Sequence, residues 1–187
     1  MNTIVKQVNS VIILGLILCL VSGCASTKGS INEIAAPVNN DNITKYGGLV
    51  VQVIADTKTG SEPKLIVDEA ASRIKDRIVN GIKKEAPHRF TEINAAVPGP
   101  QTILSNIRIK NFEEGNAFAR FMMAGLGQMH IDADVDLSDY KTHEALGKYE
   151  VTKTFAWGGL YGASQKITDI EEGFSDAVIE TILRVSK

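Results

Sequence analysis

The stretch Met129-His130-Ile131-Asp132-Ala133-Asp134-Val135-Asp136-Leu137-Ser138-Asp139-Tyr140 alternates apolar and polar side chains. Because successive side chains of a β-strand point to opposite faces, this alternation predicts a strand with one buried and one wet face. The two faces would carry the following residues: Ile131, Ala133, Val135 and Leu137 on one, and His130, Asp132, Asp134 and Asp136 on the other. Residues 141–144 suit a turn, so we expect residues 146–157 to return as the hairpin partner.

Upstream of this hairpin, residues 49–55 are rich in β-branched side chains and apolar on both faces, which indicates a central, buried strand. Pro63 can begin a helix, and apolar residues at spacings of three and four then predict an amphipathic helix of about 20 residues that stops near Pro87. We also expect a short strand at 90–93 and a longer strand at 102–112.

A second amphipathic helix is predicted near the C-terminus. Thr168 and Glu171 have the spacing of a capping box, and apolar residues then recur on one stripe as far as Val185. The order of elements is β-α-β-β-β-α. It predicts an α+β fold with a single mixed β-sheet of about four to five strands and both amphipathic helices packed on one face.

The N-terminal segment has the pattern of an export signal. Its apolar run, Val11 to Val21, is shorter than the roughly 20 residues that a membrane-spanning helix needs. Small residues and then Cys24 follow this run, a pattern that resembles the bacterial lipobox. The resemblance implies that residues 1–23 are a cleaved signal peptide and that Cys24 carries lipid. We expect residues 24–47 to be a flexible tether and residues 48–187 to be one domain.

Two other interpretations of the N-terminus are an ordinary cleaved signal and a short anchor helix. Polar residues follow at once from Ser26 to Ser30, which disfavours a helix, and an ordinary cleavage site would not need Cys24. In the lipoproteins that this segment resembles, an aspartate after the cysteine retains the protein in the inner membrane. Ala25 stands there, so the resemblance implies the outer membrane, with the domain facing the periplasm.

Charge and cysteine content narrow the possible partners. The chain has 20 basic and 22 acidic residues and a net charge of −2, which lacks the basic excess of nucleic-acid-binding proteins. Cys19 would leave with the signal peptide, and Cys24 would be bonded to lipid. We therefore expect no nucleic-acid partner, no disulfide, no thiol catalysis and no cysteine-bound metal.

The three aspartates on the wet face of the 129–140 strand, Asp132, Asp134 and Asp136, could bind a divalent cation. Calcium, however, needs six to eight oxygens at about 2.3–2.6 Å, which three side chains along a straight strand cannot provide. The simpler interpretation, which we prefer, is a solvated face, with Lys148 or Lys153 pairing across the hairpin.

No catalytic motif stands out. The histidines form neither an i, i+4 pair nor a His-Glu motif: His88, His130 and His143. Neither Ser72 nor Ser164 lies in a Gly-x-Ser-x-Gly motif. The glycines at 125 and 127 could suggest a phosphate loop, but a strand follows them where a helix is needed. We expect no enzymatic activity, no cofactor and no metal.

Residues 112–127 are unusually apolar for a glycine-punctuated segment, with the following large side chains: Phe112, Phe118, Phe121, Met122, Met123 and Leu126. We favour core packing for them, and the alternative is a surface that faces a partner or lipid. The same choice, with the same preference, applies to Trp157, Leu160 and Tyr161.

The same segment resembles a family of bacterial lipoproteins, domain of unknown function 4410. The family has a strand that ends in phenylalanine, a Gly-Asn pair, an arginine four residues after the Asn, and a glycine-rich turn. The corresponding residues here are Phe112, Gly115, Asn116, Arg120, Gly125 and Gly127. The family often continues with another glycine, where this chain has Gln128-Met129.

The resemblance covers most of residues 45–185 and implies an envelope lipoprotein with an α+β domain, but it supplies no activity. Arg120 would stand alone in an apolar segment. We expect it to hold the loop to the domain by donating hydrogen bonds to loop carbonyls or by pairing with a carboxylate.

Two functions remain open. The first, which we prefer, is a non-catalytic binding or assembly module of the envelope, tethered to the membrane through Cys24, with an envelope protein as its partner. The second is a periplasmic hydrolase or small-ligand-binding protein whose site forms only in three dimensions. Its candidate residues would be Arg120, His130 and Asp132.

Overall fold

The structure is a computed structural model that describes residues 28–35, 44–56, 62–123 and 126–186. The predicted signal peptide, Cys24 and Gly125 lie outside these ranges.

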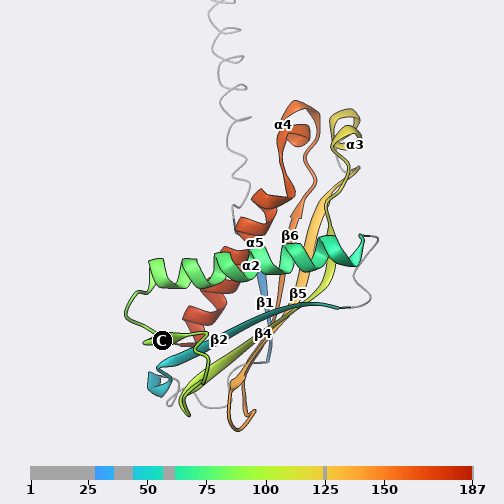
Figure 1. Cartoon of the computed structure of the whole chain (residues 1–187). Helices are drawn as coiled ribbons and strands as arrows, with labels where there is room; N and C mark the ends of the chain where they lie inside the picture. Colours follow the sequence, from blue (N-terminus) through green and yellow to red (C-terminus); the bar gives the residue numbers. More distant parts are fainter. Residues whose placement is uncertain (1–27, 36–43, 57–61, 124–125, 187) are drawn as a thin grey trace, which may run out of the picture.

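One mixed sheet runs through the whole domain (Figure 1). Its six strands lie in the order β1 (Ser30–Ala35), β6 (Ala145–Phe155), β5 (Met129–Asp139), β4 (Thr102–Glu113), β2 (Gly48–Ala55) and β3 (Glu92–Ile93). β2 pairs in parallel with β4 and with the short β3, and the other neighbours are antiparallel. The parallel pairing of β2 and β4 requires a crossover, which α2 (Lys64–Glu85) provides.

The two long helices, α2 and α5 (Ile167–Val185), pack on the same face of the sheet and contact each other. Their apolar stripes bury against the inward residues of the strands. In β5 these are the predicted residues Ile131, Ala133, Val135 and Leu137. Glu171 of α5 is fully buried and pairs with Arg73 of α2 at 2.6 Å, which joins the two helices. The predicted α+β class, the mixed sheet and the 129–157 hairpin are therefore confirmed.

The element count differs from the prediction, because the described residues form six strands and four helices. The additional strand is β1, which lies inside the segment that we expected to be a flexible tether. It pairs with β6 from Ser30↔Thr152 onwards, so that part of the prediction is wrong. The physical reason is that β6 would otherwise present an unpaired edge of backbone donors and acceptors, which β1 covers.

The two additional helices are short: α3 (Ala117–Met122) and α4 (Gly159–Ser164). Both lie in glycine-rich segments for which the sequence predicted no helix. They stand next to each other at the end of the sheet where β6 ends (Figure 1).

Two local predictions are also corrected. The capping box at the start of α5 uses Asp169, whose carboxylate accepts a hydrogen bond from the Lys166 amide at 3.0 Å, because Glu171 is turned into the core. β2 is buried on one face only, and Ile54 on its other face is 47% exposed. The described helices cover only one side of the sheet, so the opposite side is open.

Candidate functional site

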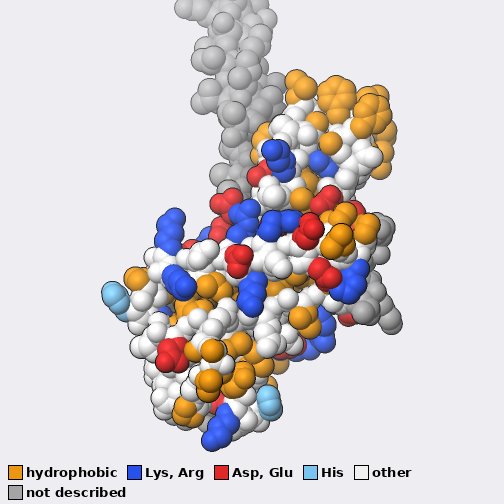
Figure 2. All heavy atoms as spheres, viewed as in Figure 1, with side chains coloured by type: hydrophobic (Ala, Val, Ile, Leu, Met, Phe, Trp, Pro, Cys, Tyr) orange, Lys and Arg blue, Asp and Glu red, His pale blue; other side chains and the backbone are white. Residues whose placement is uncertain are grey.

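An exposed apolar surface caps one end of the molecule. We call α3, α4 and their flanking residues, 115–123, 126–128 and 157–165, the apolar tip. Its exposed large side chains are Phe118, Phe121, Met122, Met123, Leu126, Trp157, Leu160 and Tyr161. Leu160 is 81% and Phe118 is 73% exposed. Figure 2 shows apolar side chains gathered at this end.

The core-packing interpretation of these side chains is therefore wrong. Of the candidates in the 112–127 segment, Phe112 is fully buried, at the end of β4 where the chain leaves the sheet. Beyond it, α3 and α4 stand past the end of the sheet, so the two long helices do not cover them.

The apolar tip also lacks exposed charge. Residues 115–128 and 156–165 contain one charged residue, Arg120, and its side chain is buried at 3% exposure. A contiguous exposed apolar patch on a folded domain marks an interaction site. The tip therefore has the composition of a binding surface.

Arg120 holds the tip together from the inside. Its Nε donates to the carbonyl of Gly162 at 2.9 Å, Nη1 donates to Gly127 at 2.8 Å, and Nη2 donates to Gln165 at 3.3 Å. One planar guanidinium therefore joins α3 to the turn that follows it and to the C-terminal half of α4. The partners are backbone carbonyls, which is the first of the two arrangements expected for this residue.

The glycines of the family motif shape the turn around Arg120. Gly115 and Gly127 have φ values of +68° and +64°, a region that other residues rarely adopt. A Cβ at Gly115 would collide with the backbone carbonyl oxygens of Gly127 and Gln128. Asn116 donates its amide to Gly127 at 3.1 Å, and its side chain caps α3 by accepting from Ala119 at 3.0 Å. These motif residues thus build the base of the tip.

Aromatic contacts connect the tip to β6. The ring of Tyr161 lies 5.9 Å from that of Phe155, which is mostly buried, and 6.2 Å from that of Trp157, edge to face. Such edge-on pairs are favourable for aromatic side chains. They orient Trp157 outward at 51% exposure.

A groove lies between the start of the described chain and the end of β6. It has a volume of about 570 Å³ and is lined by residues 28–30 and 152–157. The Lys153 ammonium donates to the Lys28 carbonyl at 3.1 Å, and Gly29 donates its amide to Gly173 of α5 at 2.8 Å. These bonds hold the first described residue, Lys28, in the groove that the tip residue Trp157 also lines.

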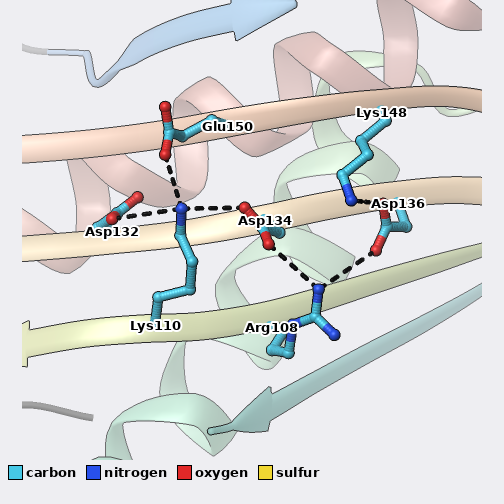
Figure 3. Close-up of polar contacts among 7 residues, drawn as sticks. All are labelled: Arg108, Lys110, Asp132, Asp134, Asp136, Lys148 and Glu150. Atoms are coloured by element: carbon cyan, nitrogen blue, oxygen red, sulfur yellow. Dashed lines mark hydrogen bonds and ion pairs between the residues drawn. The ribbon is translucent and has the colours of Figure 1, made fainter. Parts of the chain in front are cut away.

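The open side of the sheet is of a different kind. Its charged side chains lie on β4, β5 and β6 and pair with one another, as Figure 3 shows. We call this set the charged face: Arg108, Lys110, Asp132, Asp134, Asp136, Lys148 and Glu150.

At the centre of the charged face, Lys110 lies 2.6 Å from Glu150, 3.0 Å from Asp134 and 3.5 Å from Asp132. Arg108 pairs with Asp134 at 3.1 Å. Lysine and arginine thus occupy the space between the aspartates that a cation would need. Among the described residues no group of histidine, cysteine, aspartate and glutamate is arranged to hold a metal.

Asp136 forms the remaining pairs, with Arg108 of β4 at 3.9 Å and with Lys148 of β6. Lys148 is 3.6 Å from Asp136 across the strands, as its predicted position suggested, whereas Lys153 turns to the N-terminal segment.

Ionisation on the charged face follows from these contacts. Burial alone would raise the pKa of Asp134, but hydrogen bonds from Lys110 and Arg108 outweigh it and lower that pKa. Burial would likewise lower the pKa of Lys110, and the carboxylates of Glu150 and Asp134 raise it. For Asp132 burial dominates over the attraction of Lys110 and raises the pKa, and its buried Oδ1 has no hydrogen-bond partner.

The candidate residues of a hydrolytic site have separate partners. Arg120 is used by backbone carbonyls in the tip, His130 contacts the Thr154 hydroxyl at 2.6 Å on the open side of the sheet, and Asp132 pairs with Lys110. His88 follows α2, and His143 lies in the β5–β6 turn. Within the described residues, therefore, these contacts do not join an acid, a base and a nucleophile.

The serines considered as nucleophiles are occupied by their own helices. Ser72 donates to the Asp68 carbonyl at 3.2 Å, and Ser164 donates to the Tyr161 carbonyl at 2.8 Å. Both contacts are local side-chain to backbone bonds.

No described helix is both long and apolar enough to cross a membrane.

From the sequence we considered both core and surface positions for the apolar segments and preferred the core. A signal for the correct choice was present, because two glycine-flanked segments, 115–128 and 156–165, share apolar composition and share a lack of charge apart from Arg120. Only the structure shows that they meet.

Comparison with solved structures shows the fold. PelC from Paraburkholderia phytofirmans, a dodecamer, is 11% identical in a variant form, with a TM-score of 0.53, covering 85% of this chain and 99% of that one. A second PelC dodecamer from the same organism is 10% identical, with a TM-score of 0.52, covering 81% and 95%. A lipoprotein candidate from Caulobacter crescentus is 10% identical, with a TM-score of 0.38, covering 79% and 92%.

No match to a curated protein was found for the sequence. A family model described as "Domain of unknown function (DUF4410)" matches residues 29–159. This match spans β1 to the start of α4 and includes every described residue of the Phe112–Gly127 motif. Because it covers more than two thirds of the sequence, the chain belongs to the DUF4410 family.

Proposed function

We propose that the protein is a lipoprotein of the bacterial envelope whose domain is a non-catalytic binding or assembly module. In this proposal Cys24 carries the lipid, the outer membrane holds it, and the domain faces the periplasm. The observation that carries the binding role is the apolar tip, a rigidly built surface whose large side chains are exposed.

The construction of the tip supports a role beyond folding. Burying a leucine or phenylalanine side chain stabilises a protein by about 1.5–3 kcal/mol, and the tip forgoes this gain at several positions. Arg120 and the glycines at 115 and 127 nevertheless hold α3 and α4 in a defined arrangement. Exposed apolar side chains on an ordered support are typical of interaction sites.

The lipid anchor is supported by the lipobox pattern, in which small residues and Cys24 follow the apolar run that ends at Val21. The chain belongs to the DUF4410 family, and the resemblance to this family implies an envelope lipoprotein, in agreement with the lipobox pattern. The assembly role draws support from PelC, which has the same fold and is a dodecamer.

The anchor is tested by substituting each cysteine in the full chain. Cys24→Ala should move the protein from the membrane fraction to the soluble periplasmic fraction, and mass spectrometry should find acyl groups on Cys24 of the wild type only. Cys19→Ala is the matched control, because it alters the signal peptide and keeps the lipidated residue. A wild-type protein that carries no acyl group on Cys24 would contradict the proposal.

The binding role is tested by photo-crosslinking in cells from Phe118, Met122 and Tyr161, with Asp136 on the charged face as the control position. Adducts should form from the tip positions and not from Asp136. If a folded, exported and lipidated protein gives no adduct with protein or lipid at any tip position, the binding role is wrong. The hydrolase or ligand-binding alternative would then be tested around His130 and Asp132.

A further inference from the structure

We propose that the apolar tip inserts into the surface of the same bilayer that holds the lipid on Cys24. The domain would then contact the membrane at two points, the lipid and the tip. This inference rests on the proposed lipid anchor and adds the partner of the tip, which is the interfacial layer of a lipid bilayer.

The place where the chain enters the domain supports insertion of the tip. β1 is antiparallel to β6, so its N-terminal end and the C-terminal end of β6 lie at the same end of the sheet (Figure 1). Lys28 and Trp157 line the same groove there. Cys24 is four residues before Lys28, and an extended chain of this length reaches at most about 14 Å. The lipid-bearing residue is therefore within about 14 Å of Lys28.

The exposed side chains of the tip also suit a bilayer surface. The tip exposes phenylalanine, leucine and methionine together with Trp157 and Tyr161, and it exposes no charge. Tryptophan and tyrosine are enriched where membranes meet water, since their rings are apolar and each carries one polar atom. A charged side chain would oppose insertion, and the tip's charged residue, Arg120, is turned inward.

The backbone hydrogen bonds of the tip are compatible with a bilayer surface as well. Peptide groups that enter a low-dielectric layer need hydrogen-bond partners inside the protein. Arg120 supplies partners for the carbonyls of Gly127, Gly162 and Gln165, and Asn116 caps α3. These polar groups thus have partners within the tip, and excluding water from them would leave none of them unpaired.

The two helices of the tip are short. Each short helix has six residues, which corresponds to about 9 Å of rise. Amphipathic segments at membrane surfaces bury to a depth of about 5–10 Å. Helices of this length are too short to span a bilayer, so the tip would enter only its surface layer.

The chain provides its own probe, because Trp157 is its single tryptophan. The lipidated full-length protein would be reconstituted into vesicles of phosphatidylethanolamine and phosphatidylglycerol. The emission of Trp157 should shift to shorter wavelength, and lipids brominated near the headgroup should quench it more than lipids brominated near the chain end.

Two leucines provide matched variants. Leu160 lies on the tip at 81% exposure, and Leu65 lies on α2 at 69% exposure. Leu160→Ser should at least halve the bromolipid quenching, and Leu65→Ser should leave it unchanged. In the unlipidated Cys24→Ala protein, Leu160→Ser should weaken vesicle partitioning about tenfold, the loss expected for one leucine.

The outcomes separate this inference from the proposed function. If the protein is anchored through Cys24 and Trp157 stays in water, the tip does not insert, and the lipoprotein proposal stands. If Trp157 is shielded without bromolipid quenching and the tip crosslinks to protein, a second copy or another protein covers it, and the inference is wrong. If the wild type fails to attach to membranes at all, the proposed anchor itself is wrong.

Discussion

The apolar tip and the charged face are both exposed, and they satisfy their side chains in opposite ways. On the charged face every member has an oppositely charged partner on another strand of the sheet. On the tip the backbone is satisfied internally by Arg120 and Asn116, while the large side chains have no cover.

This difference separates a surface that is complete from one that is not. Exposed ion pairs are individually worth about 0–1 kcal/mol and are compatible with water, so the charged face requires no partner. Exposed apolar side chains gain free energy only when something covers them. The more conspicuous chemistry, three aspartates in a row, is therefore the less informative about function.

The largest effect is expected from Arg120→Ala. The substitution removes hydrogen bonds to three backbone carbonyls, and the buried ones lose their partners, so we expect a loss of about 2–4 kcal/mol in the stability of the tip. Limited proteolysis between residues 115 and 165, together with urea unfolding, measures this loss. Arg120→Lys should be less stable than the wild type and more stable than Arg120→Ala, since one ammonium cannot reach all three carbonyls. Unchanged stability and protease resistance would show that Arg120 does not hold the tip.

A smaller loss is expected on the charged face. Lys110→Met leaves Asp132 and Glu150 without a cation and leaves Arg108 as the ion-pair partner of Asp134. These groups are partly exposed and screened, so the expected cost is about 1–2 kcal/mol in urea unfolding. Lys148→Met is the control, because it removes one long contact to Asp136 and should cost less than about 0.5 kcal/mol. A smaller loss for Lys110→Met than for Lys148→Met would contradict this description of the charged face.

The two central aspartates should respond to pH with opposite signs. The folded protein lowers the pKa of Asp134, so its contribution is present above the unfolded value of about 3.9 and is lost as pH falls through the folded value. It raises the pKa of Asp132, so that contribution is lost as pH rises through the folded value.

Asp134→Asn should therefore reduce stability at pH 7 and flatten the loss in acid, while Asp132→Asn should leave stability at pH 7 equal or higher. Thermal unfolding from pH 3 to pH 7 measures both. The same sign of change for the two variants at pH 7 would exclude this assignment of pKa shifts.

The smallest effect on folding is expected at the tip surface. Phe118→Ser and Leu160→Ser alter exposed side chains and should change the free energy of unfolding by no more than about 0.5 kcal/mol. Thermal unfolding of the soluble Cys24→Ala protein measures this. A loss well above this size would mean that the side chains pack within the fold, and the contrast between the two surfaces would disappear.

The regular part of the fold could be predicted because its patterns are local. The alternation in residues 129–140 identifies β5, and the spacing of apolar residues after Pro63 identifies α2. β1 could not be identified in this way, because the sequence Ser-Ile-Asn-Glu-Ile-Ala becomes a strand by pairing with β6, which is over 100 residues distant.

The tip was missed for a related reason. Helices of six residues are too short to display a period, and an apolar side chain is more often buried than exposed. The chemistry of Arg120 could be anticipated from its five donors in an apolar segment. Its connection of α3 to α4 could not, because it depends on the meeting of segments about 40 residues apart.

The incorporation of β1 into the sheet also has a consequence for binding strength. It shortens the connection between Cys24 and the folded domain to the few residues before Lys28. The contact of the tip with the bilayer is then an intramolecular step, with an effective concentration on the order of millimolar or higher. A surface that binds lipid only weakly as a free domain would be bound most of the time once Cys24 is acylated. Acylation would therefore set the orientation of the domain as well as its location.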